Sequence, residues 1–211
     1  QLSNSKDQTY NVNYKHDFDK KGHNIEFEAT YSENETPQDL FNSDLVRPND
    51  GSLNYFNDIF NDRSTTLVNL DYTNPVSENG KLELGLEYRA NNTENTNITN
   101  QTGFNNSSFS YDRKIYSGYV NYGHQFGKLS MQLGARIEQF NIEGVFNQET
   151  QASQTVTDDI FTVYPSAFFT YNPSDKNQFQ LSYSKRVDRP NIQQVNPIRE
   201  WSTPLITSVG N

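Results

Sequence analysis

The sequence predicts an all-β fold, because apolar and polar residues alternate with a period of two along most of the chain and almost no stretch has helical spacing. Two further observations concern the length of the alternating stretches and the way they are joined. Several stretches continue for ten residues or more, and short turn-like connections alternate with long polar ones. Together these features favour an antiparallel, up-and-down transmembrane β-barrel segment of about eight strands, with four hairpins, short periplasmic turns and long extracellular loops.

The expected strands share one pattern. In the stretch 82–89, leucine and tyrosine at even positions alternate with Glu83, Glu87 and Arg89 at odd positions. Such an apolar stripe faces a packed core in a water-soluble fold and lipid in a membrane barrel, where the polar stripe lines the lumen. In chain order, the stretches expected as strands are 10–18, 25–31, 68–72, 82–89, 116–126, 129–138, 163–171 and 179–187.

The connections fall into two length classes. "DKKGH", "NPVSENG", "FGK" and "NPSDKN" are short, with Gly, Pro, Asn and Asp supplying the backbone angles of tight turns. The long polar connections run through about residues 33–63, 91–108 and 147–160, and a fourth opens near Pro190. In an up-and-down sheet the two classes lie at opposite ends, as in outer-membrane barrels, whereas a Greek-key sandwich would mix them.

Composition excludes several classes of protein. The 211 residues carry a net charge of -9, so clustered positive charge for nucleic acid is lacking, and no partner of that kind is expected. The 14 Phe and 13 Tyr are too many for a disordered chain. No apolar run approaches the length of a transmembrane helix. Without a nucleophile elbow, a phosphate-binding glycine loop or a metal-ligand motif, the sequence predicts neither an enzyme nor a bound cofactor.

Motifs near the C-terminus resemble a known family. They are Tyr164-Pro165-Ser166, Tyr171-Asn172-Pro173, Gln180-Leu181-Ser182-Tyr183-Ser184, Arg186, Arg189-Pro190-Asn191, Asn196-Pro197 and Gly210-Asn211, and earlier "LGLEYR" at 84–89 and "LGARIE" at 133–138. The chain thereby resembles the C-terminal barrel of TonB-dependent outer-membrane receptors, in particular the outer membrane β-barrel group common in Bacteroidetes. The resemblance is specific for residues 161–211.

The resemblance implies a location, partners and a role. The protein is expected in the outer membrane of a Gram-negative bacterium, in contact with outer-membrane lipid, taking up a nutrient that the sequence does not identify. Such receptors are 22-stranded barrels with an N-terminal plug, energised through TonB, and often work with a surface lipoprotein. With room for about eight strands and no plug, residues 1–211 are expected to be a partial barrel domain of a larger receptor that contacts TonB through regions outside this chain. A complete eight-stranded barrel is the alternative by strand count.

Two groups of residues follow as candidates. The alternation predicts a lumen-facing set consisting of Glu83, Glu87, Arg89, Arg136, Glu138 and Arg186. An extracellular rim is expected at Asp188, Arg189 and Trp201, where a strand leaves the membrane. The rim could contact substrate or a partner, or serve only rim electrostatics.

Other interpretations remain open from sequence alone. A soluble or surface-exposed β-sandwich that binds glycan or protein would turn the same apolar stripes toward each other across a core. Acidic pairs such as Glu83 and Glu87 could flank a glycosidic bond in a hydrolase, although a lumen wall suits them better. The acidic loop 33–63 could hold Ca²⁺ but lacks the spacing of an EF-hand.

Overall fold

The computed structural model describes residues 2–42, 54–189, 200–203 and 206–208. All regular elements among them are strands, which confirms the predicted all-β fold. They are β1 (Leu2–Ser3), β2 (Lys6–Asp17), β3 (Asn24–Asn42), β4 (Tyr55–Ser77), β5 (Gly80–Thr99), β6 (Ser107–Phe126), β7 (Leu129–Gln148), β8 (Gln151–Ser174), β9 (Asn177–Ser184), β10 (Glu200–Thr203) and β11 (Ile206–Ser208). No helix in the described part of the chain is long and apolar enough to cross a membrane.

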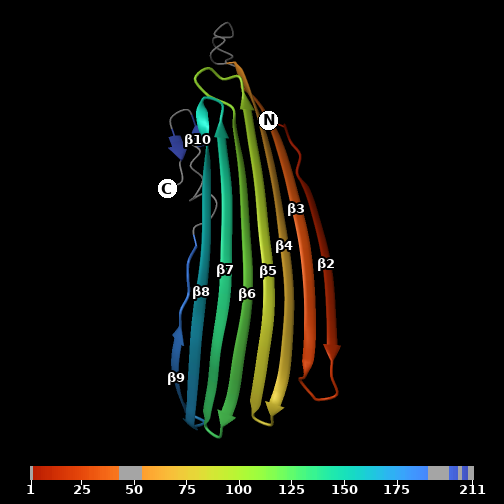
Figure 1. The fold of residues 1–211 in the computed structure, drawn as a ribbon, viewed down its shortest axis with the longest axis vertical. Coiled ribbons are helices and arrows are strands. Elements are labelled where there is room, and N and C mark those ends of the chain that lie inside the picture. Colours follow the sequence, from red (N-terminus) through yellow and green to blue (C-terminus); the bar gives the residue numbers. More distant parts are fainter. Residues whose placement is uncertain (1, 43–53, 190–199, 204–205, 209–211) are drawn as a thin grey trace.

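The strands β2 to β9 form one long antiparallel sheet in which each strand lies beside its neighbours in the sequence (Figure 1). The eight strands confirm the predicted up-and-down order. The short strand β1 pairs with β3 beyond the end of β2, and β10 and β11 form a separate two-stranded sheet. Among the described strands, β2 pairs only with β3 and β9 only with β8, so the sheet is open at both sides.

The four short turns lie together at one end of the sheet, at the bottom of Figure 1. Three of them contain two residues, namely 78–79, 127–128 and 175–176, and the fourth occupies 18–23. Gly22 and Gly127 adopt positive φ values of 79° and 57°, which the turns require and glycine tolerates without strain. The predicted turn positions are therefore confirmed.

At the other end, the predicted long loops are largely wrong. Residues 33–42, 55–63, 91–99 and 151–160 continue the strands, so the connections shrink to 100–106, to 149–150 and to a segment between β3 and β4. Of that last segment, residues 43–53 lie outside the described residues, as do most residues of the fourth loop expected from Pro190 onward. Polar residues can extend these strands because the backbone ladder needs no apolar side chains, and amides such as Asn91 bond across strands, here to Thr65 at 2.9 Å.

Adjacent residues point to opposite sides of the sheet. We call the side that carries Leu86 the apolar face and the side that carries Glu87 the polar face. On the apolar face, Leu86 pairs with Leu70 and Gly118, and Gly118 pairs with Ile137. On the polar face, the next row contains Asn69, Glu87, Ser117 and Glu138.

The apolar face has limits along the strands. On β6 it runs from Phe126 at the turn to Tyr116, which packs against Tyr88 with ring centroids 5.0 Å apart. Ten steps of about 3.3 Å along a strand tilted by about 40° cover roughly 25 Å, the height of the apolar band of an outer-membrane barrel. Beyond Tyr116 the same face becomes polar, and Asp112 pairs with Glu143 there. The strands thus extend well past the apolar band.

Candidate functional site

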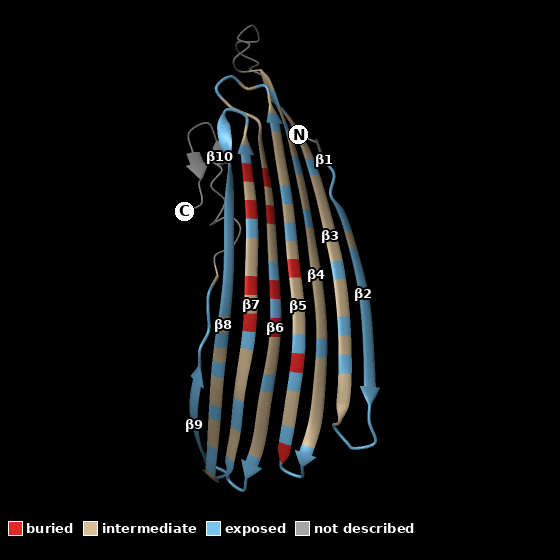
Figure 2. Cartoon of the chain, in the orientation of Figure 1, coloured by how far each residue is buried: buried red, intermediate tan, exposed pale blue. Residues whose placement is uncertain are grey.

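Burial on the two faces is the reverse of a water-soluble protein. On β7, Glu138 is 7% exposed, whereas the neighbouring Ile137 is 50% exposed. On β5, Leu86 is 62% exposed. The buried residues lie on β5, β6 and β7 (Figure 2). All those on β6 and β7 belong to the polar face, whereas Gly80 and Ala90 on β5 belong to the apolar face. In a water-soluble protein, carboxylates are almost never buried while large apolar side chains face water. The exposed apolar face is therefore suited to contact with hydrocarbon.

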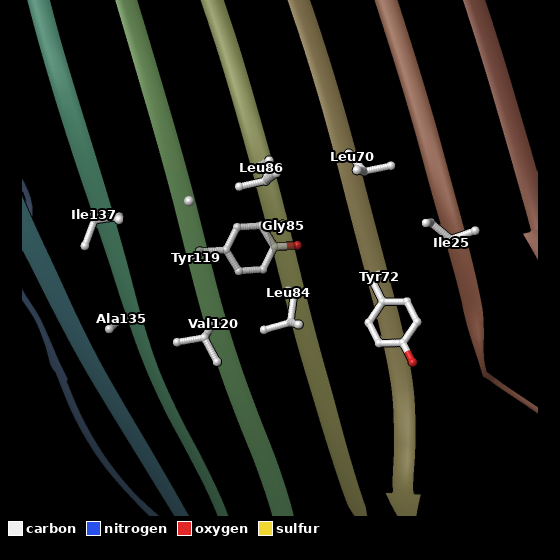
Figure 3. Close-up of a pocket in the computed structure, with 11 residues that line it drawn as sticks. Ile25, Leu70, Tyr72, Leu84, Gly85, Leu86, Tyr119, Val120, Ala135 and Ile137 are labelled. Atoms are coloured by element: carbon white, nitrogen blue, oxygen red, sulfur yellow. The ribbon is translucent and has the colours of Figure 1, made fainter.

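The apolar face has a shallow groove along its centre (Figure 3). Gly118 has no side chain, and Leu86 and Ile137 stand on either side of it, with Leu84 and Val120 one row nearer the turns. Among the described strands no second large sheet covers this surface, as a β-sandwich would require. The groove therefore belongs to the apolar band and is lined almost entirely by apolar atoms.

A chain of alternating charges crosses the polar face. Arg136 Nη2 lies 3.1 Å from Glu87 Oε1, and Arg136 Nε lies 3.5 Å from Glu138 Oε2. Arg89 Nη2 approaches the same Glu87 oxygen at 3.5 Å. Arg136 also donates a hydrogen bond of 2.8 Å to Ser117 Oγ. Four of the six predicted lumen-facing residues are thus joined in one network, which we call the charge network: Glu87, Arg89, Arg136 and Glu138, with Ser117.

Arg189 completes the charge network from outside the sheet. Its guanidinium forms an ion pair with Glu138, donates a hydrogen bond of 3.1 Å to Tyr164 OH, and lies 4.2 Å from the centroid of the Phe140 ring. From the sequence, Arg189 is expected at an extracellular rim, yet its side chain is only 18% exposed. With three guanidinium groups against two carboxylates, the completed network carries one positive charge in excess.

The remaining candidates lie apart from this network. Glu83 forms an ion pair of 2.5 Å with Lys81 on the same strand. Arg186 and Asp188 are exposed and follow the last residue of β9. Trp201 belongs to β10, and its side chain lies outside the described residues.

Tyr119 makes a contact that sequence reasoning missed. Its ring lies across Gly85 of the neighbouring strand, and its hydroxyl donates a hydrogen bond of 2.6 Å to Asp71 Oδ1 on the strand beyond. A Cβ atom on Gly85 would stand 2.0 Å from Tyr119 Cε1, so only glycine leaves room for the ring. A glycine inside a strand, opposite a tyrosine, was the available signal, but the pairing register was needed to read it.

An aromatic cluster lies on the polar face beyond the apolar band. Phe109 stacks on Phe146 with centroids 4.6 Å apart and on Tyr111 at 5.9 Å, and all three are buried. Burial raises the pKa of the Tyr111 hydroxyl, while the positive charge of Arg113 acts in the opposite direction. These residues were also missed, because positions 109, 111 and 146 lie between the expected strands and the expected loops.

The histidines pack against aromatic rings at the end of the sheet where the short turns lie. His23 lies against Phe18 and within 2.9 Å of Tyr72 OH, and His124 packs on Phe126. In the described part of the chain, no three His, Asp or Glu side chains are grouped so as to hold a metal ion.

Comparisons with known proteins agree with this geometry. The model of the outer membrane protein β-barrel family matches residues 16–211. The siderophore receptor PiuA from Acinetobacter baumannii is similar in structure, with a TM-score of 0.64, 17% identity, and coverage of 86% of this chain and 32% of PiuA. The unliganded ferric citrate transporter FecA gives a TM-score of 0.54, 13% identity, and coverage of 81% of this chain and 26% of FecA. No curated protein sequence matches.

Proposed function

Since the chain belongs to the outer membrane protein β-barrel family, we propose that it is part of the barrel of a TonB-dependent receptor that takes up a nutrient. Family membership identifies it as an outer-membrane β-barrel protein, related in fold to TonB-dependent receptors. The proposal goes further, to uptake through the barrel that contains these strands. The observation that carries it is the reversed burial, with Glu138 covered and Ile137 exposed.

The proposal includes a larger barrel. An eight-stranded sheet with two open sides leaves backbone donors and acceptors unpaired, which is costly in lipid. The chain covers only about a third of the length of PiuA and a quarter of FecA. These facts support residues 1–211 as a partial barrel domain whose open sides pair with further strands of the same protein.

In the closed barrel the polar face would line the lumen. Fixed arginines and carboxylates there would bind polar or ionic groups of a substrate through charge-assisted hydrogen bonds, without reaction chemistry. The lumen wall of the proposal consists of Glu83, Glu87, Arg89, Arg136, Glu138 and Arg186, and Asp188 and Trp201 belong to its extracellular rim. Beyond Tyr88 and Tyr116, where the apolar band ends, the extended strands would form a vestibule outside the membrane.

The proposed partners follow from the same assignment. The apolar face contacts outer-membrane lipid. TonB would act through regions of the full-length protein outside this chain, and a surface lipoprotein would bind at the extracellular end.

The test is uptake by cells that carry the full-length receptor. Candidate iron chelates, glycans, peptides and vitamins are offered to cells with the receptor, cells without it, and cells with the receptor but no functional TonB. We expect one class to accumulate only when receptor and TonB are both present. In the receptor, Glu87→Gln should reduce uptake of that class, whereas Leu84→Ile on the apolar face should not. Uptake that is indifferent to the receptor or to TonB for every class would contradict the proposal.

A further inference from the structure

The chain leaves the sheet soon after β9. The pairing of β9 with β8 ends at Ser184, which lies opposite Ser166, and one further backbone bond of 3.2 Å joins Lys185 N to Pro165 O. Strand β8 itself continues past this point toward Gln151. The part of β8 beyond Pro165 is therefore not paired with residues 186–189, the last described residues of this segment.

The register shows where these residues would lie if the strand continued. Because Ser184 opposes Ser166, Asp188 would oppose Thr162 and Arg189 would oppose Phe161. Phe161 stands on the apolar face and is 62% exposed. A continued ladder would thus turn the Arg189 guanidinium toward the apolar face, level with Tyr116 at the edge of the apolar band.

Arg189 instead lies on the polar face. Its partners there come from two strands, Glu138 and Phe140 from β7 and Tyr164 from β8. Glu138 is the most deeply buried carboxylate of the charge network, and it forms a second ion pair, with Arg136. Val187, two residues before Arg189, is 53% exposed and takes no part in this packing.

We propose that residues 185–189 form a strap that folds from the end of β9 onto the polar face, where the Arg189–Glu138 ion pair latches it. The strap has two alternative positions, the latched one and the continued ladder with β8. In the latched position the guanidinium contacts Glu138, Tyr164 and the Phe140 ring, so these three contacts favour that position over the continued ladder. Given the proposed uptake function, the latched strap narrows the lumen, and its return to the ladder widens it.

Cysteine cross-linking in the full-length receptor in outer membranes distinguishes the two positions. Residues directly opposite in an antiparallel ladder have Cα atoms about 4.5–5.5 Å apart, within the range of a disulfide. The present chain has no cysteine, so Thr162→Cys with Asp188→Cys reports the ladder once other cysteines of the receptor are replaced. We expect little cross-linking in this double-cysteine receptor.

Releasing the latch should change that result. Arg189→Leu removes the latch and places an apolar side chain where the ladder faces lipid, so the cross-linked fraction should rise from a minor part to most of the receptor. Glu138→Gln should raise it without altering the strap, which keeps the test valid if the first variant does not fold. Arg186→Leu is the matched control, since it removes a strap charge outside the latch, and it should leave cross-linking low.

Strong cross-linking in the double-cysteine receptor that keeps Arg189 and Glu138 would overturn the strap proposal. Equal cross-linking with and without Arg189→Leu or Glu138→Gln would overturn it as well. The cross-linked fraction is measured without any transport assay, so it tests the strap even if the uptake proposal fails. Conversely, if uptake is established and Arg189→Leu leaves cross-linking low, the strap alone is refuted.

Discussion

Gly85→Ala should destabilise the barrel although it adds only one methyl group. The new Cβ would stand 2.0 Å from Tyr119 Cε1 and 2.6 Å from Asp71 Oδ1, and such distances force the tyrosine ring away from the sheet. The hydrogen bond of 2.6 Å between Tyr119 OH and Asp71 is then lost. Gly118→Ala is the matched control on the opposite face, because its Cβ would meet Leu86 Cδ2 at an ordinary 3.4 Å.

The expected loss can be worked out from these contacts. A hydrogen bond to a charged group contributes about 1.5–3 kcal/mol. Replacing glycine by alanine restricts the unfolded chain and returns about 0.4–1 kcal/mol where the backbone tolerates alanine. The net effect of Gly85→Ala is therefore a decrease of about 1.5 kcal/mol in the free energy of unfolding, or roughly tenfold in the equilibrium constant. Gly118→Ala should change it by less than about 1 kcal/mol.

The assay is guanidinium-induced unfolding of the full-length receptor in lipid vesicles, followed by tryptophan fluorescence. A double-mutant cycle with Tyr119→Ala isolates the cause, since Gly85→Ala should become nearly neutral once the ring is absent. An unchanged midpoint for Gly85→Ala, or an equal loss in the Tyr119→Ala background, would refute the close packing of the ring on Gly85.

Three further substitutions test other parts of the barrel by the same unfolding assay. Ile137→Arg should lower the free energy of unfolding by about 2–4 kcal/mol because it places a charge in the apolar band, whereas Val145→Arg, beyond that band, should cost about 0–1 kcal/mol; equal costs would contradict the position of the band. Phe146→Ala should cost about 3–5 kcal/mol, since a buried stacked ring is removed, and a negligible cost would mean that the aromatic cluster is not packed. Glu87→Gln should cost about 1–2 kcal/mol because two arginines lose their shared partner, and a gain in stability would argue against the charge network.

The sequence predicts the parts of the fold in which side chains differ between the two faces. Period-two alternation gives the strand segments inside the apolar band, and Gly127 with its neighbours gives the sharp turn between β6 and β7. Outside the band, the segment 91–99 is mostly polar on both faces, so it shows no alternation and resembles a loop. Their backbone ladders and side-chain amide contacts depend on the neighbouring strand, which a single segment does not reveal.

For the candidate site, the sequence predicts which face the charged residues share but not which of them form pairs. Alternation selects Glu87, Arg136 and Glu138 as residues of one face, but their pairing depends on the register of β5, β6 and β7. Arg189 was expected at a rim because it follows a strand in the sequence. Its position against Glu138 depends on the path of the chain after β9, and no local pattern encodes that path.

The lipid-facing apolar face is tested most directly by the side of the sheet that each residue of β5 faces in the intact receptor. Single cysteines at Glu83, Leu84, Leu86 and Glu87 are labelled in outer membranes with a charged, water-soluble maleimide and, separately, with a lipid-soluble one. We expect the water-soluble reagent to label only positions 83 and 87, and the lipid-soluble reagent to label positions 84 and 86 preferentially. Labelling of all four positions by the water-soluble reagent, or the opposite phase, would contradict a lipid-facing apolar face and a water-filled polar face.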